Sequence, residues 1–425
     1  MREQLRELLN QEVVLATGCT EPGAVALCVA KARETLGSMP DDVEVLLSKN
    51  VFKNAMGVGI PGTGMIGLPI AVAMALTAGE SCRQLEVLML PEDKVETAKA
   101  WLANNADKIH ISVKDTTDKL YIECHCRKDN HVAEAVISKR HTNFVRIALD
   151  GKMLSDSLAD VAKPTCAEAS VQNVSPVNLT ARMVYEYATT APIEELRFIR
   201  ETVKYNVAAS REGLNGYGLH AGAILNENAA GDIVHTVVAR AVAASDARMD
   251  GCTLPIYSNS GSGNQGIACT VPVYEYGMLK GCDEDSITRA LILCHLMSIY
   301  VKRGIGRLSA LCGIVNASIG VTSGIVFLHG GGFEQIGYAI KNMINTLAGM
   351  VCDGAKPSCA LKMATGLYSA FVCAELAYHD QVVDATDGLS ERGLDESIRN
   401  LGRLGHDGMN ETDDIVLDIM THKQV

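Results

Sequence analysis

Aromatic side chains are scarce in this chain. Only 4% of its 425 residues are Phe, Trp or Tyr, whereas 38 are glycine. The hydrophobic core must therefore consist of Ala, Val, Leu, Ile and Met, and the many glycines allow backbones to approach one another closely. This composition suits a helical core built around a buried cofactor.

An excess of positive charge is also missing. The chain has 38 basic and 50 acidic residues, which gives a formal net charge of -12. Binding to nucleic acid or to an anionic membrane needs clustered positive charge, so the sequence predicts neither kind of partner. Chemistry on a small molecule is the expected alternative.

Low-complexity tracts, repeats of fixed period and long charge runs are absent, which argues against arrays and disordered tails. The first residues, MREQLRE, are charged and lack the apolar segment of a secretion signal. We therefore expect a cytoplasmic, reducing location. In such a compartment the 14 cysteines serve packing, metal binding or catalysis rather than disulfides.

One stretch resembles a membrane span by length alone, because residues 308–328 contain no charged side chain. Its serines, threonine, asparagine and glycines make transfer into lipid much weaker than for a leucine-rich span. Gly320 and Gly324 stand four residues apart, which lets another backbone approach closely. We expect a buried helix in a soluble core.

The pattern of the chain changes near residue 160. The chain is longer than one core normally allows, so two domains are expected. Period-two or β-branched runs predict strands at 43–47, 109–113, 120–124 and 144–149, with helices at 66–78 and 92–106. Helical periodicity then dominates, with helices expected at 178–187, 193–208, 286–302 and 397–404.

The predicted fold class is therefore α+β, with an N-terminal α/β module followed by a larger all-α catalytic domain. We place the first domain at residues 1–160 and the second at 165–425, with the boundary near 155–165.

Three cysteines lie in the glycine-rich, weakly charged last third of the chain: Cys312, Cys352 and Cys359. Gly354 and Pro357 keep the segment between the last two from being helical, so that a short loop can direct both thiols to one place. A three-thiolate set leaves one metal position open for a substrate, whereas a structural zinc site normally has four protein ligands. From the residues alone, an iron–sulfur cluster, a zinc ion and simple packing all remain open.

A fourth cysteine, Cys19, lies in the run TGCTEPG just before a predicted helix, in which Pro22 marks the first turn. Free amides and the dipole at a helix N-terminus lower a thiol pKa, so a thiolate that attacks, binds metal or accepts a proton is one interpretation. A small buried residue in a tight turn is the other.

Polar groups that suit a carboxylate occur at two further places. The loop SNSGSGNQG at 258–266 exposes backbone amides in the manner of an anion-binding nest, although a plain solvent loop has the same composition. Arg248 is able to grip a carboxylate in bidentate fashion or to form a structural ion pair with Asp246. Lys362 would be the suspect in a pyridoxal-phosphate lyase that ran an elimination.

Taken together, these runs resemble the L-cysteine desulfidase family, which is related to the iron–sulfur L-serine dehydratases. The resemblance spans nearly the whole chain and rests on the following segments: GCTEP at 18–22, KN at 53–54, PGTGM at 61–65, SDAR at 245–248, 258–266, RLSALC at 307–312 and 349–359. The related serine dehydratases carry Ser-Ser-His where this chain has Gly-Cys-Thr at 18–20, which favours a thiol substrate over a hydroxyl one.

The resemblance implies a [4Fe-4S] cluster held by Cys312, Cys352 and Cys359, with the fourth iron open to the substrate sulfur, and Cys19 as catalytic base. It implies β-elimination of L-cysteine to pyruvate, ammonia and hydrogen sulfide. The residues expected to bind the amino-acid substrate are Thr20, Asn54, Arg248, Ser260, Gly261, Ser262 and Asn264. Alternatives are an L-serine dehydratase-like or other ammonia-lyase on the same site, or a non-enzymatic metal- or amino-acid-binding protein. A second copy of the chain, forming a homodimer, is the one macromolecular partner considered.

Overall fold

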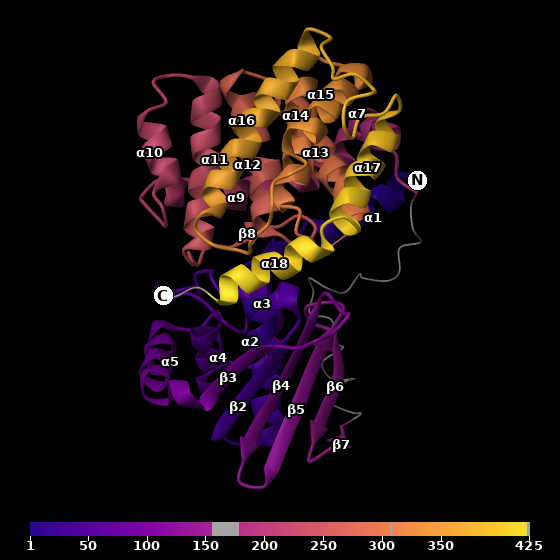
Figure 1. Cartoon of the computed structure of the whole chain (residues 1–425). Coiled ribbons are helices and arrows are strands. Elements are labelled where there is room, and N and C mark those ends of the chain that lie inside the picture. Colours follow the sequence, from indigo (N-terminus) through magenta and orange to yellow (C-terminus); the bar gives the residue numbers. More distant parts are fainter. Residues whose placement is uncertain (155–177, 307, 423–425) are drawn as a thin grey trace.

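The computed structural model describes residues 1–154, 178–306 and 308–422. The expected boundary at 155–165 and Arg307 lie outside the described residues. The chain folds as α+β, with a sheet-containing module near its start and a larger helical region after it, as Figure 1 shows. The fold class expected from the sequence is confirmed.

The first module is built on a six-stranded sheet in the order β3-β2-β4-β5-β6-β7. Strands β2 and β3 are parallel and the other pairs are antiparallel. Helix α2 (Thr20–Leu36) packs against β4, β5 and β6, and α4 (Leu68–Thr77) packs between α2 and α5 (Glu92–Asn105). The strands are β2 (Asp42–Leu47), β3 (Ile109–Val113), β4 (Tyr121–Lys128), β5 (His131–Ser138), β6 (Phe144–Leu149) and β7 (Lys152–Met153).

The four predicted strands and the helix at 92–106 are confirmed to within a few residues. The helix expected at 66–78 starts later, at Leu68, because Gly67 adopts a left-handed φ of 85° and so precedes the helix as its N-cap. In β2, buried and half-buried side chains alternate, which is the pattern of a strand with one face against a helix layer.

The second module is a bundle of helices. The helix predicted at 178–187 begins at Ala181, because the Thr180 side chain caps it by accepting a hydrogen bond from the Met183 amide. The described helices of this region are α7 (Ala181–Thr190), α8 (Ile193–Leu196), α9 (Arg200–Gly213), α10 (Ala221–Glu227), α11 (Ile233–Met249), α12 (Gly263–Leu279), α13 (Glu284–Ile305), α14 (Gly313–Leu328), α15 (Phe333–Leu347), α16 (Cys359–Tyr378), α17 (Leu394–His406) and α18 (Asn410–Thr421).

The prediction of one helix over 193–208 was wrong. Residues 197–199 wind into a 3-10 turn, η3 (Arg197–Ile199), between α8 and α9. A 3-10 turn places residues three apart on the same side, and this brings both Leu196 and Ile199 into the core.

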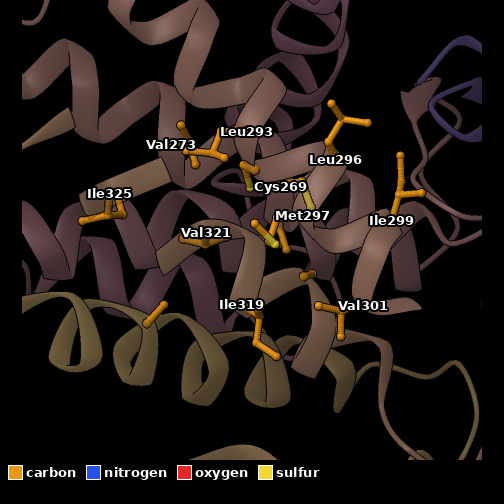
Figure 2. Packing of buried hydrophobic residues seen from close by; sticks show 14 of the residues in the cluster. Cys269, Val273, Leu293, Leu296, Met297, Ile299, Val301, Ile319, Val321 and Ile325 are labelled. Atoms are coloured by element: carbon orange, nitrogen blue, oxygen red, sulfur yellow. The ribbon is translucent and has the colours of Figure 1, made fainter. Parts of the chain in front are cut away.

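Helix α14 forms the centre of the bundle and packs against α12, α13, α15 and α16. A Cβ on Gly320 would lie 2.4 Å from the Cys294 carbonyl oxygen, so glycine permits α13 and α14 to approach closely. Figure 2 shows the apolar side chains of α12, α13 and α14 that meet there. The uncharged run at 308–328 is thus a buried helix, as predicted, although it begins only at Gly313.

Three elements connect the two modules. Helix α1 (Arg2–Glu12) buries its leucines in the core of the helical region, although it precedes the sheet in sequence. Strand β1 (Leu15–Ala16) pairs with β8 (Ile256–Tyr257), a short strand that the all-helical prediction lacks. Helix α18 lies against α3 (Lys49–Ala55) between the modules, as Figure 1 shows.

One described helix, α16, is long and apolar enough to cross a membrane by length and composition alone. It packs against α11, α14 and α15 of the bundle. Its apolar character is therefore that of a core helix on the side that meets these neighbours.

Candidate functional site

The three cysteines predicted as ligands come together through a short backbone bridge. Leu311 and Val351 form an isolated antiparallel bridge. On its two sides the Cys312 amide donates to the Met350 carbonyl at 2.9 Å, and the Cys352 amide donates to the Ala310 carbonyl at 2.6 Å. This bridge sets two cysteines that lie 40 residues apart in sequence side by side.

Each outer cysteine also marks a helix start. Cys312 is the N-cap of α14, and Cys359 is the first residue of α16, after a non-helical loop that contains Gly354 and Pro357 as predicted. All three thiols line one cavity. The cysteines of the described part of the chain are free.

The surroundings of the triad favour the thiolate form of Cys352, whereas burial raises the pKa of Cys359. A hydrogen bond from Cys312 and the ammonium groups of Lys53 and Lys362 lower the pKa of Cys352 to about 5 against the cost of burial. The same hydrogen bond, together with burial, raises the pKa of Cys312. A metal takes cysteine as thiolate, so the two lysines provide charge of the sign that a thiolate-ligated group requires.

The three thiols are not equally spaced. The described residues whose ligand atoms all lie within 4.8 Å of one another do not include these three cysteines. Cys312 and Cys352 nevertheless share a side-chain hydrogen bond, so a distance to Cys359 is the longer one.

The loop that carries Cys352 is fixed to the sheet module by buried charge. Lys53, which is 2% exposed, forms an ion pair with Asp413 of α18 and donates to the Cys352 carbonyl at 3.2 Å. Asn50 donates to the other Asp413 oxygen at 3.1 Å. Gly354 has a φ of 90°, and a Cβ there would lie 2.1 Å from the Lys53 carbonyl oxygen. Only glycine fits at this contact.

Lys362 also serves this loop. It donates to the Val351 carbonyl at 2.8 Å and pairs with the Asp353 carboxylate. Both contacts hold its ammonium group against the cysteine loop.

Cys19 lies next to the triad as the N-cap of α2, as the sequence predicted. It packs with Val58 and Met249, and Cys359 packs against the same small group. The expected lowering of its pKa is wrong, because burial raises the pKa of the Cys19 thiol to about 11 and outweighs the charge of Arg248. The buried thiol is thus a weak acid whose thiolate is a strong base.

Arg248 joins Cys19 to the glycine-rich loop. Its Nη2 donates to Cys19 Sγ at 3.1 Å and to the Gly18 carbonyl at 3.2 Å, and Nη1 donates to Asn264 Oδ1 at 3.3 Å. Nε is buried and has no protein partner among the described residues. Asp246 instead accepts from the Gly222 amide at 2.8 Å, so the structure places Arg248 in the site rather than in an ion pair with Asp246.

The loop at 258–266 ends in the N-terminus of α12, which Ser262 caps. The nest expected over residues 260–262 is only partly available, because the Ser260 amide donates to the Glu12 carbonyl and the Ser262 amide to the Asn259 carbonyl. Among the described contacts, the amides of Gly261, Gly263 and Asn264 have no protein acceptor. Of these three residues Gly261 and Asn264 line the cavity, so their amides are the available anion donors.

Two further predicted residues have protein partners. Asn54 lines the cavity and donates to Glu21 at 3.1 Å. Thr20 is not among the lining residues, and its hydroxyl lies 3.4 Å from the Gly261 carbonyl, to which it donates. Thr20 therefore stabilises the glycine-rich loop without lining the cavity.

The cavity has a volume of about 410 Å³ and lies between the two modules. The helices α2, α12, α14 and α16 all begin at its wall, so four positive helix ends meet there. Such a wall stabilises anionic groups. The lining includes the following predicted residues: Cys19, Asn54, Arg248, Ser260, Gly261, Ser262, Asn264, Cys312, Cys352 and Cys359.

Sequence reasoning missed several residues of the site. Lys53 was named only within the segment KN at 53–54, and nothing in the sequence around Asp413 links that residue to the cavity. Asn259 belongs to the loop that was singled out, but His295, its buried partner, lies in a helical run that shows only apolar periodicity. Glu21 belongs to the segment GCTEP at 18–22. Its position in the first turn of the expected helix was the signal that could have identified it as a site residue.

Comparisons with known proteins identify the family of the chain. Residues 82–418 match the family described as serine dehydratase alpha chain. A UPF0597 protein of Bacteroides thetaiotaomicron is 49% identical over 99% of this chain and 98% of its own length. One from Oleidesulfovibrio alaskensis is 42% identical over 98% of this chain and 97% of its own length. The chain belongs to the serine dehydratase alpha chain family.

Proposed function

We propose that this protein is an iron–sulfur-dependent lyase that degrades L-cysteine to pyruvate, ammonia and hydrogen sulfide in a reducing, cytoplasmic compartment. The observation that carries the proposal is the meeting of Cys312, Cys352 and Cys359, from separate segments, at a cavity that also holds Cys19 and Arg248. The family match supports a lyase acting on a β-substituted amino acid.

The three cysteines would hold a [4Fe-4S] cluster, whose fourth iron, when the cluster is bound, supplies a Lewis acid for a sulfur leaving group. The observed donor set fits this group. It offers three thiols that line one cavity, two lysines that favour thiolates and two helix N-termini behind the ligands.

The remaining groups would act on the amino-acid part of the substrate. Cys19 would act in its thiolate form, which is the minor form near neutral pH because burial raises the pKa of the thiol to about 11. This thiolate would take the Cα proton as the bond from Cβ to sulfur breaks, which leaves aminoacrylate and sulfide. Aminoacrylate tautomerises and takes up one water to give pyruvate and ammonia. The Arg248 hydrogen bond stabilises the Cys19 thiolate, and the amides at the start of α12 suit the substrate carboxylate.

The test is anaerobic reconstitution, followed by iron and acid-labile sulfide assays and by turnover of L-cysteine beside L-serine. We expect about four irons per chain, with sulfide release from L-cysteine exceeding pyruvate formation from L-serine. Cys19→Ser should retain the iron and lose turnover, whereas Cys352→Ser should lose both. Cluster-loaded protein that prefers L-serine would favour the dehydratase alternative, which the description of the matching family supports. Full turnover by Cys19→Ser would overturn the role of Cys19.

A further inference from the structure

A continuous set of hydrogen bonds runs from the cavity wall into the core beneath Ser260. It links Ser260 to Asn259, Asn259 to His295 of α13, and His295 to Thr270 of α12. Asn259, His295 and Thr270 are completely buried. No solvent reaches these groups, so each hydrogen bond must have one donor and one acceptor within the protein.

The contacts of Asn259 fix which atoms in this set of hydrogen bonds donate and which accept. Its Nδ2 lies 3.2 Å from the His295 backbone carbonyl, which can only accept, and this contact identifies the amide nitrogen. The same nitrogen lies 3.0 Å from His295 Nδ1. His295 Nδ1 is therefore the acceptor, and the ring proton is on Nε2.

The opposite side of the histidine agrees with this assignment. His295 Nε2 lies 3.1 Å from Thr270 Oγ1, and the Thr270 hydroxyl gives its own proton to the Gly266 carbonyl at 2.8 Å. The Thr270 oxygen therefore accepts from His295, and it also accepts from Asn206 Nδ2 at 3.1 Å. Every proton in the set has a defined acceptor.

At the cavity end, the direction of these hydrogen bonds determines whether the Ser260 hydroxyl donates to a ligand or accepts from it. Asn259 Oδ1 can only accept, so the Ser260 hydroxyl donates its single proton inward at 2.9 Å. The Ser260 amide is already bonded to the Glu12 carbonyl. Ser260 thus presents only acceptor lone pairs to the cavity.

We infer that Ser260 binds the ammonium group of the substrate and not its carboxylate, and that His295 is a positioning residue that holds Ser260 in this acceptor state. The carboxylate then lies on the free amides of Gly261 and Asn264, beside Arg248. A Cβ on Gly263 would lie 2.1 Å from Arg248 Nε, so that unpartnered donor lies at the same helix end. This inference rests on the proposed function, because it takes the substrate to be an amino acid.

Two thiols separate the two substrate groups. Cysteamine has an amino group and no carboxylate, whereas 3-mercaptopropionate has a carboxylate and no amino group. In calorimetric titrations of the anaerobically reconstituted protein, Ser260→Ala should weaken cysteamine roughly ten- to a hundredfold, the range for one hydrogen bond to a charged group, and leave 3-mercaptopropionate unchanged.

The matched control is Ser258→Ala, because the Ser258 hydroxyl donates to the Val14 carbonyl at 2.9 Å and not to the set. It should change neither affinity. Weakening of 3-mercaptopropionate alone, equal weakening of both ligands, or no change in either would each overturn the assignment of Ser260.

The role of His295 is tested through Ser260. His295→Leu should weaken cysteamine selectively, and adding Ser260→Ala in that background should weaken it little further. Thr270→Val tests the same hydrogen bonds if the leucine variant does not fold. Thr288→Val is its control, since in the described part of the chain that buried hydroxyl bonds only to the Glu284 carbonyl of its own helix. Equal loss of both ligands, or a full additional effect of Ser260→Ala, would make His295 merely structural.

Failure of this inference is distinguishable from failure of the proposed function. Titration needs no turnover, whereas the proposed function is judged by sulfide release from L-cysteine by the unaltered protein. Protein that releases sulfide while Ser260→Ala leaves the cysteamine affinity unchanged would retain the function and lose the inference.

Discussion

At the scale of single residues, Gly354 shows how one backbone conformation holds the site together. Its left-handed φ and its contact with the Lys53 carbonyl leave no room for a Cβ. Gly354→Ala should lower the free energy of unfolding by about 2–4 kcal/mol and reduce iron retention, since Cys352 lies in the same loop. Urea unfolding and iron assays check this.

The control is Gly349→Ala, because no atom lies within 4 Å of a Cβ built there and its φ is not in the left-handed region. Equal stability of the two alanine variants would show that the loop adapts to a side chain at residue 354.

Glu123 is a residue of the sheet with a distinct pH dependence. Burial raises its pKa, but hydrogen bonds from Lys114, Tyr121 and His125 outweigh burial and lower that pKa from 4.5 to about 2. A carboxyl whose pKa is lower in the folded state stabilises the fold above its unfolded pKa, and this contribution is lost as the pH falls from about 4.5 towards 2.

Glu123→Gln should therefore cost about 1–3 kcal/mol at pH 7, and the difference from the unaltered protein should shrink below about pH 4.5. Urea unfolding of the cluster-free protein between pH 7 and pH 3.5 measures this. Glu44→Gln is the control, since its pair with Arg127 is more exposed and should be worth less than about 1 kcal/mol. A pH-independent effect of Glu123→Gln would mean that its charge is not the cause.

At the scale of elements, α18 is attached to α3 by one buried and one exposed ion pair. Asp413 pairs with buried Lys53, and its neighbour Asp414 pairs with exposed Lys49 at 2.7 Å. Asp413→Ala would leave the Lys53 ammonium group buried and unpaired, which should cost about 3–5 kcal/mol. Asp414→Ala should cost less than about 1 kcal/mol.

Thermal and urea unfolding of the two variants distinguish these values, and iron content shows whether the cysteine loop moves with α18. Similar losses from Asp413→Ala and Asp414→Ala would contradict the dominance of the buried pair. The adjacent positions make the comparison direct, because Asp413 lies in the first turn of α18 and Asp414 follows it in the same helix.

Elements with a clear local period were predictable, and those defined by distant contacts were not. The strand at 43–47 and the helix at 92–106 follow from alternation and from helix-forming residues within the segment itself. The pairing of β1 with β8 depends on a partner about 240 residues away, and the burial of α1 against α13 on one still farther along the chain, which no local pattern encodes.

The same division holds within the site. Cys312, Cys352 and Cys359 were found from residue type and spacing, and Arg248 and the loop at 258–266 from their polar character. The thiol pKa of Cys19 was misjudged, because the helix end is visible in sequence whereas the burial that outweighs it is a property of the fold.

At the scale of the whole molecule, the charge of the cavity opposes the charge of the chain. The formal net charge is -12, yet among the described residues five cationic side chains line the cavity against two acidic ones, Glu21 and Asp118. The cationic residues are Lys119, Lys139, Arg248, Lys302 and Lys362. A cavity of one sign in a protein of the other directs anions inward by a field that salt screens.

The affinity of reconstituted protein for anionic 3-mercaptopropionate should therefore fall as salt rises from 20 to 500 mM, over which the screening length drops from about 20 Å to about 4 Å. Cysteamine, a cation at neutral pH, should show no such loss. Lys139→Gln should flatten the salt dependence for 3-mercaptopropionate, whereas Lys99→Gln, on the outer helix α5 and paired with Glu96 at 2.7 Å, should not. Calorimetric titration at several salt concentrations measures the affinity of each of the two variants for each of the two ligands. Parallel salt dependences for the two ligands would mean that the local fields of the helix ends and of Arg248, and not the summed charge of the cavity, attract the substrate.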